Sequence, residues 1–314
     1  MRYAAFMRYT LRQLEYFVAA GEAGSIRHAS ERLSISQPSI STAISHLELE
    51  LNVQLFIRHH AQGLSLTSVG QILMEEAKRV LGMAENLYSL AAETTDQVRG
   101  TLSVGSMVTL APMIMPELVH SFCTRYPAAE IRQVASNHEW LAEKLKQAEI
   151  DIAITYDLHL PTGIEFVPLA SLPPHVLVSE NHHLAQRSSV DLAELAAEPM
   201  IFLDLPLSRQ YFNALYHHEG LQPNIYARSA EQEVVRTMVA NGYGYTLANV
   251  RPCSDMALDG KKVVRVRLSG DHRPMVIGMA TWQGVRKSRL LDLFVHHCRS
   301  SISDTAIPGM KPLT

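Results

Sequence analysis

Residues 36–51, SQPSISTAISHLELEL, decide how the N-terminal part of this chain folds. Their apolar residues recur at helical spacing, at Ile40, Ala43, Ile44, Leu47 and Leu51. Ser36 can accept a hydrogen bond from a free N–H of the first turn, and Pro38 lacks an N–H that would need a partner. The stretch therefore predicts a helix with a well-defined start.

Two more helical stretches precede this helix, and a hairpin follows it. One apolar stripe consists of Leu11, Leu14, Phe17 and Val18; a second, after Gly24-Ser25, consists of Ile26, Ala29 and Leu33. Because only residues 34–36 separate the second and third helices, the pair predicts a helix-turn-helix. Residues 55–57 and 64–66 flank a turn at 59–63 and predict a two-stranded wing. Residues 8–67 are thus predicted to form a winged helix-turn-helix, which makes double-stranded DNA the first partner to consider.

The polar face of the third helix is the expected recognition surface. Its side chains are short or form hydrogen bonds, which suits a major groove, and Arg58 at the base of the wing can reach a phosphate. An ordinary solvated helix face is the alternative. The candidate DNA-binding residues are Arg27, Ser36, Gln37, Pro38, Ser39, Ser41, Thr42, Ser45, His46 and Arg58.

Residues 68–98 contain no proline and predict one long linker helix, roughly 45 Å long at about 1.5 Å per residue. Thr67 or Ser68 can cap it, and Ser68 with Gln71 has the spacing of a capping box. Steps of four and three, typical of a dimerisation seam, connect Leu73, Ala77, Val80, Ala84, Leu87 and Ala91. Packing of this face on the helix's own domain is the alternative.

Residues 99–314 alternate short β-like runs with helical stretches. The runs cover residues 102–105, 131–135, 152–156, 176–179, 200–203 and 225–228. This alternation predicts an α/β architecture with mainly parallel sheets. The length suffices for two subdomains.

The N-terminal pattern resembles the DNA-binding domain of LysR-type transcriptional regulators. The matching residues are Leu11-Arg12-Gln13-Leu14, Gly24-Ser25, Ala29, Leu33, Ser36-Gln37-Pro38-Ser39, Ile44, Leu47-Glu48, Leu51, Leu55-Phe56, Arg58 and Leu66-Thr67-Ser68-Val69-Gly70. Later family motifs recur at Tyr126-Pro127, residues 150–154, His183-Leu184-Ala185, residues 198–201 and residues 239–244. The resemblance therefore covers nearly the whole chain. It departs from the common family pattern at Thr42, where many members have Arg, and at Ala148, where many have Gly.

The resemblance implies a periplasmic-binding-protein-like effector domain of two subdomains, at about 99–173 with 270–300 and about 174–269. The chain is expected to leave the first near Pro173-Pro174 and return at 269–275, with a small-molecule effector between the halves. The resemblance also implies paired linker helices and self-association as a dimer of dimers.

The charge of the DNA-binding module is the main departure from a typical nucleic-acid binder. Residues 8–67 contain five arginines and five glutamates, and 5 − 5 leaves no net charge. Because neutralisation of phosphates supplies most non-specific affinity, one module should bind weakly. Several linked modules would then be needed to hold an operator.

Ligands of open α/β sheets bind beyond the carboxyl ends of strands, which selects a set of effector candidates. They are Ser106, Thr109, Ser136, Asn137, His138, Asp204, Ser208, Ser229 and Asn249, with Tyr156 as a neighbour. Ser106, His138 and the loop at Asp204 match family ligand positions, whereas Ser136, Asn137 and Ser229 can equally be helix caps. Helix N-termini favour anions, so an organic acid, a carboxylate, is the effector class to test first.

Other chemistries receive little support. Cys123, Cys253 and Cys298 are widely spaced and predict reduced thiols, and only Cys253 falls in the second subdomain, where a redox switch would need two. Adjacent residues point apart on helices and strands, so no metal site is expected at His59-His60, His182-His183, His217-His218 or His296-His297. With no catalytic or nucleotide-binding motif, we expect neither an enzyme nor a cofactor. No apolar run is long enough for a membrane span and no signal segment opens the chain, so a cytoplasmic protein is expected. The tripeptide Met1-Arg2-Tyr3 is repeated at Met7-Arg8-Tyr9, which suggests Met7 as the native start.

Two function classes follow from these observations. The first is a DNA-binding transcriptional regulator, activator or repressor, that responds to a small molecule. The second is a soluble small-molecule receptor whose N-terminal domain makes only protein contacts, an alternative that the neutral charge keeps open. The wing and the Gln-Pro-Ser helix start favour the first.

Overall fold

The structure is a computed structural model that describes residues 8–59, 63–92, 98–284 and 288–312. The proposed start at Met7 lies outside these residues. The chain divides into two compact units, residues 1–97 with 144–150 and residues 98–143 with 151–314. Each unit is described by itself.

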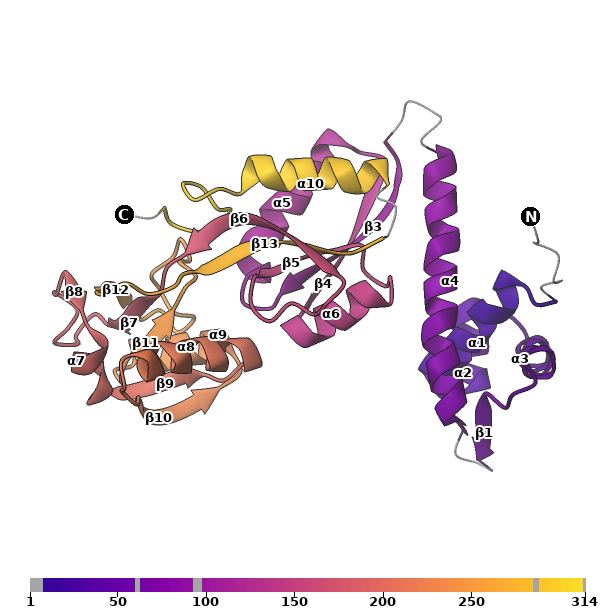
Figure 1. The fold of residues 1–314 in the computed structure, drawn as a ribbon, viewed down its shortest axis with the longest axis horizontal. Helices are drawn as coiled ribbons and strands as arrows, with labels where there is room; N and C mark the ends of the chain where they lie inside the picture. Colours follow the sequence, from indigo (N-terminus) through magenta and orange to yellow (C-terminus); the bar gives the residue numbers. More distant parts are fainter. Residues whose placement is uncertain (1–7, 60–62, 93–97, 285–287, 313–314) are drawn as a thin grey trace. The chain divides into compact units, whose positions relative to one another are not determined.

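The N-terminal unit is the predicted winged helix-turn-helix (Figure 1). Thr10 and Gln13 form a capping box at the start of α1, and Ser36 caps α3 with a hydrogen bond from the Ser39 N–H. The wing strands pair in antiparallel register from Phe56↔Leu66 to His59↔Gly63. The elements are α1 (Leu11–Ala23), α2 (Ile26–Leu33), α3 (Gln37–Leu51), β1 (Phe56–His59) and β2 (Gly63–Leu66). The sequence predictions for these elements are confirmed.

One apolar core holds this unit together. Phe17 of α1 stacks edge to face on Phe56 of β1 at 5.5 Å, and Ile40 and Leu47 of α3 are fully buried against them. Gly70 lies close to the wing, since a Cβ there would meet the Leu55 carbonyl oxygen at 2.1 Å. The wing and the next helix can therefore pack this closely only with glycine at that position.

The linker helix α4 (Ser68–Ala92) corrects the predicted seam. Thr67 caps it, with its hydroxyl accepting the Gly70 N–H at 2.9 Å. Leu73 and Ala77, two of the predicted seam residues, pack into the core beside α1, whereas Val80 remains 39% exposed. Val69, Ile72 and Met83 are exposed as well. The first turns of α4 face inward because α1 needs an apolar cover, which removes Leu73 and Ala77 from a seam between chains and leaves Val80 on the free face. The seam residues Leu87 and Ala91 lie outside the residues whose side chains the structure describes.

The effector domain contains two lobes built around separate sheets (Figure 1). In the first, the strand order is β4-β3-β5-β13-β6, with β3 parallel to β4 and β5 and with β13 antiparallel to β5 and β6. Its elements are β3 (Gly100–Met107), α5 (Ala111–Arg125), β4 (Ala129–Ser136), α6 (His138–Lys146), β5 (Ile152–Tyr156), β6 (Ile164–Leu172), β13 (Met275–Trp282) and α10 (Arg289–Ser301). The chain leaves the first lobe after β6 and returns to it at β13.

The second lobe contains a four-stranded sheet, β11-β7-β12-β8, and the parallel pair β9–β10. Its elements are β7 (His175–Ser179), β8 (Ser189–Val190), α7 (Leu192–Ala196), β9 (Pro199–Leu203), α8 (Pro206–His218), β10 (Asn224–Ser229), α9 (Gln232–Ala240), β11 (Thr246–Ala248) and β12 (Val263–Leu268). The predicted strand runs all fall in strands, but the sheets are mixed rather than mainly parallel. The reason is that the chain leaves the first lobe and returns to it, and the returning strand β13 runs antiparallel to its neighbours β5 and β6.

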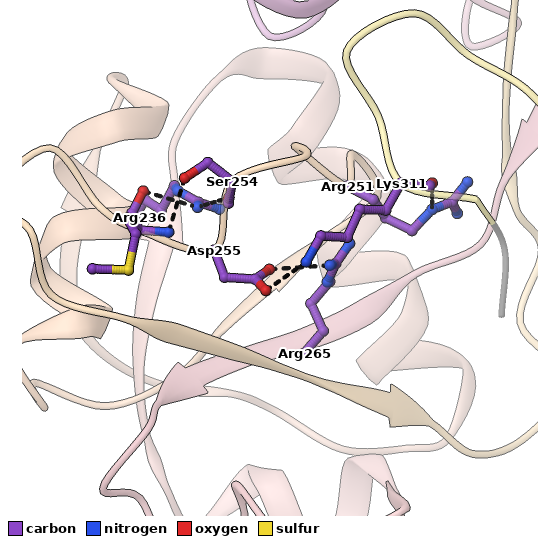
Figure 2. A network of polar contacts seen from close by, with 7 residues as sticks. Arg236, Arg251, Ser254, Asp255, Arg265 and Lys311 are labelled. Carbon is purple, nitrogen blue, oxygen red and sulfur yellow. Dashed lines mark hydrogen bonds and ion pairs between the residues drawn. The ribbon is translucent and has the colours of Figure 1, made fainter.

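Two crossings connect the lobes, between β6 and β7 at residues 173–174 and between β12 and β13 at residues 269–274. The segment after α10 adds a third connection, which we call the C-terminal strap (residues 302–312). The Cys253 N–H donates to the Gly309 carbonyl at 3.1 Å, and the Lys311 N–H donates to the Arg251 carbonyl at 2.8 Å. Figure 2 shows Lys311 and Arg265 both paired with the Asp255 carboxylate. The strap thus ties the end of the first lobe to the second.

Candidate DNA interface and effector cavity

The polar face of α3 is exposed along its whole length. Gln37, Thr42 and Ser45 are exposed and Ser41 is half-buried, whereas the apolar face lies in the core. A shallow hollow at the start of the helix is lined by Ile26, Ser30, Gln37, Pro38 and Ser41. The exposed face therefore offers the hydrogen-bonding side chains that a helix needs to read base edges in a major groove.

Four of the predicted DNA-binding residues already have side-chain partners inside the unit: Ser36, Ser39, His46 and, on α2, Arg27. The hydroxyls of Ser36 and Ser39 lie 2.7 Å apart at the helix start. His46 accepts a hydrogen bond from the Gln13 side chain at 3.1 Å, which fixes its ring on α1. Ser36, Ser39 and His46 position the start and the middle of α3, and the contact of all four residues with DNA stays a prediction.

Two arginines of the N-terminal unit, Arg27 and Arg32, are held in ion pairs. Arg27 pairs with Glu31 at 3.1 Å on the exposed side of α2. Glu22 of α1 receives Arg32 at 2.8 Å and Lys78 of α4 at 3.0 Å, so three helices meet at one carboxylate. Burial alone would raise the pKa of Glu22, but these two cations lower it below its usual value. Arg58 on β1 is exposed and has no ion pair among the described residues, which leaves it available for a phosphate.

The effector domain contains a cavity at the junction of the lobes. It leaves about 560 Å³ free of atoms, part of it open to solvent, which limits an occupant to a small molecule. Thr109, Tyr156 and Met275 come from the first lobe, and the other lining residues come from the second. Those residues are Leu177, Leu203, Ser208, Phe212, Gln232, Val235, Arg236, Thr246, Leu247, Ala248, Asn249, Val250 and Pro252.

Three polar side chains of the cavity, those of Thr109, Tyr156 and Asn249, are buried and hydrogen-bonded within the domain. The Thr109 and Tyr156 hydroxyls lie 3.2 Å apart, and burial raises the pKa of Tyr156, so its hydroxyl keeps its proton. Asn249 donates to the Leu172 carbonyl at 2.8 Å, immediately before the first crossing, while its Oδ1 is buried without a partner among the described residues. Such an acceptor is costly unless a ligand or water donates to it. A small molecule that carries a donor group would satisfy this oxygen, as would water.

The structure brings four of the ten predicted effector residues to this cavity, namely Thr109, Tyr156, Ser208 and Asn249. The other six have different surroundings. Ser106 is fully buried in β3, and His138 bonds Thr155 at 3.0 Å, with burial lowering the pKa of its ring. Asp204 pairs with Arg209 at 2.6 Å.

The remaining three lie at the ends of strands. Asn137 caps α6 by accepting the Trp140 N–H, Ser229 accepts the Glu231 N–H, and Ser136 ends β4 half-buried. For Asn137 this bond is the helix cap that the sequence left open as an alternative. Ser229 instead bonds within the turn before α9, whose N-cap is Glu231. A role for these residues in effector binding stays a prediction.

Sequence reasoning missed the charged member of the cavity. Arg236 is the only charged side chain among the described lining residues, and it is 5% exposed. It donates to the carbonyl oxygens of Ser254 and Met256 (Figure 2). A cation inside the otherwise apolar pattern of α9 was the available signal, since a buried arginine requires acceptors or an anion.

A winged helix-turn-helix joined by a long helix to a two-lobed α/β domain with a cavity defines a class of ligand-responsive DNA-binding regulators. Two family models match the chain: the bacterial regulatory helix-turn-helix protein of the lysR family at residues 11–71, and the LysR substrate binding domain at residues 95–303. The chain belongs to the LysR family of transcriptional regulators.

Several known proteins are similar over nearly the full length. HinK, a LysR family regulator from Pseudomonas aeruginosa, shares 38% identity with a TM-score of 0.64, covering 94% of this chain and 99% of that chain. The uncharacterized HTH-type transcriptional regulator YybE of Bacillus subtilis (strain 168) is 30% identical, covering 93% of this chain and 99% of its own. CbnR, solved in complex with its target DNA, shares 25% identity with a TM-score of 0.67, covering 93% of this chain and 99% of that chain.

Two further observations concern chemistry and membranes. Cys123, Cys253 and Cys298 are all free, and burial raises the pKa of Cys298 to about 12, which makes that thiol unreactive. Among the described helices, none is long and apolar enough to cross a membrane.

Proposed function

We propose that this protein is a cytoplasmic regulator that binds double-stranded promoter DNA through α3 and the wing, and that a small molecule in the cavity modulates this binding or its effect on transcription. The polar face of α3, on which Gln37, Thr42 and Ser45 are exposed without a side-chain hydrogen bond among the described residues, is the observation that carries the proposal. A solvated face would need neither a fixed helix start nor an exposed Arg58 at the base of the wing. Gln37 would read a base edge, and Arg58 would contact the backbone.

Self-association supplies the affinity that one neutral module lacks. The exposed line of Val69, Ile72, Val80 and Met83 on α4 suits pairing with the same helix of a second copy, and two such dimers would form a tetramer. The CbnR complex with its target DNA supports the DNA-binding part of this proposal for a relative of full length.

The effector class follows from the cavity. Arg236 favours an anion, and the Asn249 Oδ1 favours a donor, so a small carboxylate that also carries a hydroxyl group fits both groups. The Asn249 bond to Leu172 joins the cavity wall to the first crossing. A ligand that changes this wall can therefore shift the arrangement of the lobes.

A footprint on the DNA upstream of its own gene and the neighbouring divergent gene, at two salt concentrations, tests the proposal. We expect protection of a two-fold-related site over several helical turns that weakens with salt. The absence of protection at low salt would instead support the receptor that acts through protein contacts, which the zero net charge of residues 8–67 favours. Thermal-shift screening of ligands would then be the next measurement.

A further inference from the structure

Three potential metal ligands converge in the second lobe, outside the residues that line the cavity. They are His182, His183 and Glu198, and one ligand atom from each lies within 4.8 Å of the other two. The His183 Nε2 is 3.4 Å from Glu198 Oε1, and the His182 Nε2 is 3.9 Å from Glu198 Oε2. No other such group of three occurs among the described residues.

The local backbone explains why two adjacent histidines point the same way. The chain turns back on itself after β7: the His182 N–H donates to the Ser179 carbonyl and the Ala185 N–H donates to the His182 carbonyl. The two rings therefore stack at 4.4 Å with an angle of 29° between their planes. The expectation of diverging side chains assumed a helix or a strand, and it does not apply to a turn.

Glu198 reaches the same place from a distant part of the sequence. Its N–H donates to the Leu195 carbonyl at the end of α7, and the next residue, Pro199, begins β9. The carboxylate is 28% exposed, so it lies at the surface, where an ion can enter. The three ligands thus come from two segments of the second lobe: the turn after β7 and the residue before β9.

Two imidazoles and one carboxylate form a donor set that Zn²⁺ accepts, with water in the fourth position. Co²⁺, Ni²⁺ and Cu²⁺ prefer the same nitrogen and oxygen ligands.

We propose that His182, His183 and Glu198 bind one divalent transition-metal ion, for which Zn²⁺ is the probe. Binding at the His182 Nε2 places the remaining proton on Nδ1, so the 3.3 Å contact from the Leu184 N–H is given up. The ion connects the turn after β7 with the start of β9. Since Leu177 of β7 and Leu203 of β9 line the cavity, it fixes two strands that support the effector site.

Calorimetric titration of untagged, metal-stripped full-length protein with Zn²⁺ tests the proposal. We expect one ion per chain. His183→Ala, at a side chain that is 64% exposed, should weaken binding at least about tenfold without loss of fold. Glu198→Gln should weaken it similarly. His217→Ala, in the adjacent pair at the end of α8, is the matched control and should bind Zn²⁺ like the parent.

A spectroscopic measurement keeps the outcome clear. Co²⁺ should give a visible absorption spectrum that disappears in His183→Ala. Binding that His183→Ala leaves unchanged, or no binding at neutral pH, would overturn the proposal. Neither result depends on whether the protein binds DNA.

Discussion

The DNA-binding unit and the effector domain place their polar side chains in opposite ways. On α3, Gln37, Thr42 and Ser45 are exposed, with no hydrogen bond to the rest of the unit among the described residues. In the cavity, Tyr156 and Asn249 are each 4% exposed and hydrogen-bonded to other residues of the domain. A change on α3 should therefore affect DNA contacts alone, whereas a change in the cavity should affect stability and coupling together.

Phe212→Ala should have the largest effect and tests the cavity side of this comparison. Phe212 is 3% exposed and lines the cavity, so its truncation should lower the free energy of unfolding by about 3–5 kcal/mol. Urea unfolding of the full chain measures this loss. Ser45→Ala on α3 is the control, with a change within about 0.5 kcal/mol. Equal losses in both variants would remove the distinction between the two regions.

Gln37→Ala should cost about 1 to 3 kcal/mol of discrimination at a single base position and leave the fold intact. Binding to promoter and random DNA, measured by fluorescence anisotropy, checks this. Arg58→Ala is the contrasting variant: it should weaken binding to all sequences alike and flatten the salt slope by about one. If Gln37→Ala weakened specific and random DNA equally, Gln37 would not read a base.

Arg236→Gln should abolish the response to a carboxylate effector while DNA affinity stays near that of the parent. The reason is that Arg236 is the only charge among the described lining residues. Because its guanidinium also donates to two backbone carbonyls, the thermal unfolding of the same variant must be measured as well, to separate a lost response from lost stability. Arg236→Lys keeps the charge and should retain part of the response. A full response in Arg236→Gln would place the acid elsewhere.

Asp255→Asn should have the smallest effect, about 1 kcal/mol or less, because the ion pairs of the C-terminal strap are partly exposed. Burial would raise the pKa of Asp255, but Lys311 and Arg265 lower it below its ordinary 3.8. Its contribution is thus present above about pH 4 and lost as the pH falls through the lowered pKa. Unfolding of parent and variant from pH 7 to pH 3 should show the difference shrinking. A difference that grew toward low pH would contradict this assignment.

The N-terminal unit shows which features local sequence predicts well. The Ser36-Gln37-Pro38 start, the apolar stripe of α3 and the wing all follow from spacing, capping and turn signals between neighbours in the chain. The crossings at 173–174 and 269–274 were likewise expected from the resemblance, and the structure has them there.

The α4 helix and the cavity show where such prediction ends. The spacing of Leu73 and Ala77 fits a seam between chains as well as a contact with α1, and only the packing distinguishes the two. The cavity joins Thr109 and Tyr156 to Asn249, and its Phe212 and Arg236 carry no motif. Strand-end rules selected four residues that line the cavity, but they could not tell a residue that faces the cavity from one that bonds its own turn.

The sequence by itself determined the helices, the wing and the α/β alternation, because periodicity and capping act between residues close in the chain. Its motifs implied the family and the two-lobed plan through their resemblance to a known family. Tertiary structure alone decided which face of α4 is free, which polar groups meet in the cavity, and that His182 and His183 face Glu198. These arrangements depend on contacts between distant segments. A turn or a buried surface changes the direction of a side chain without leaving a local signal in the sequence.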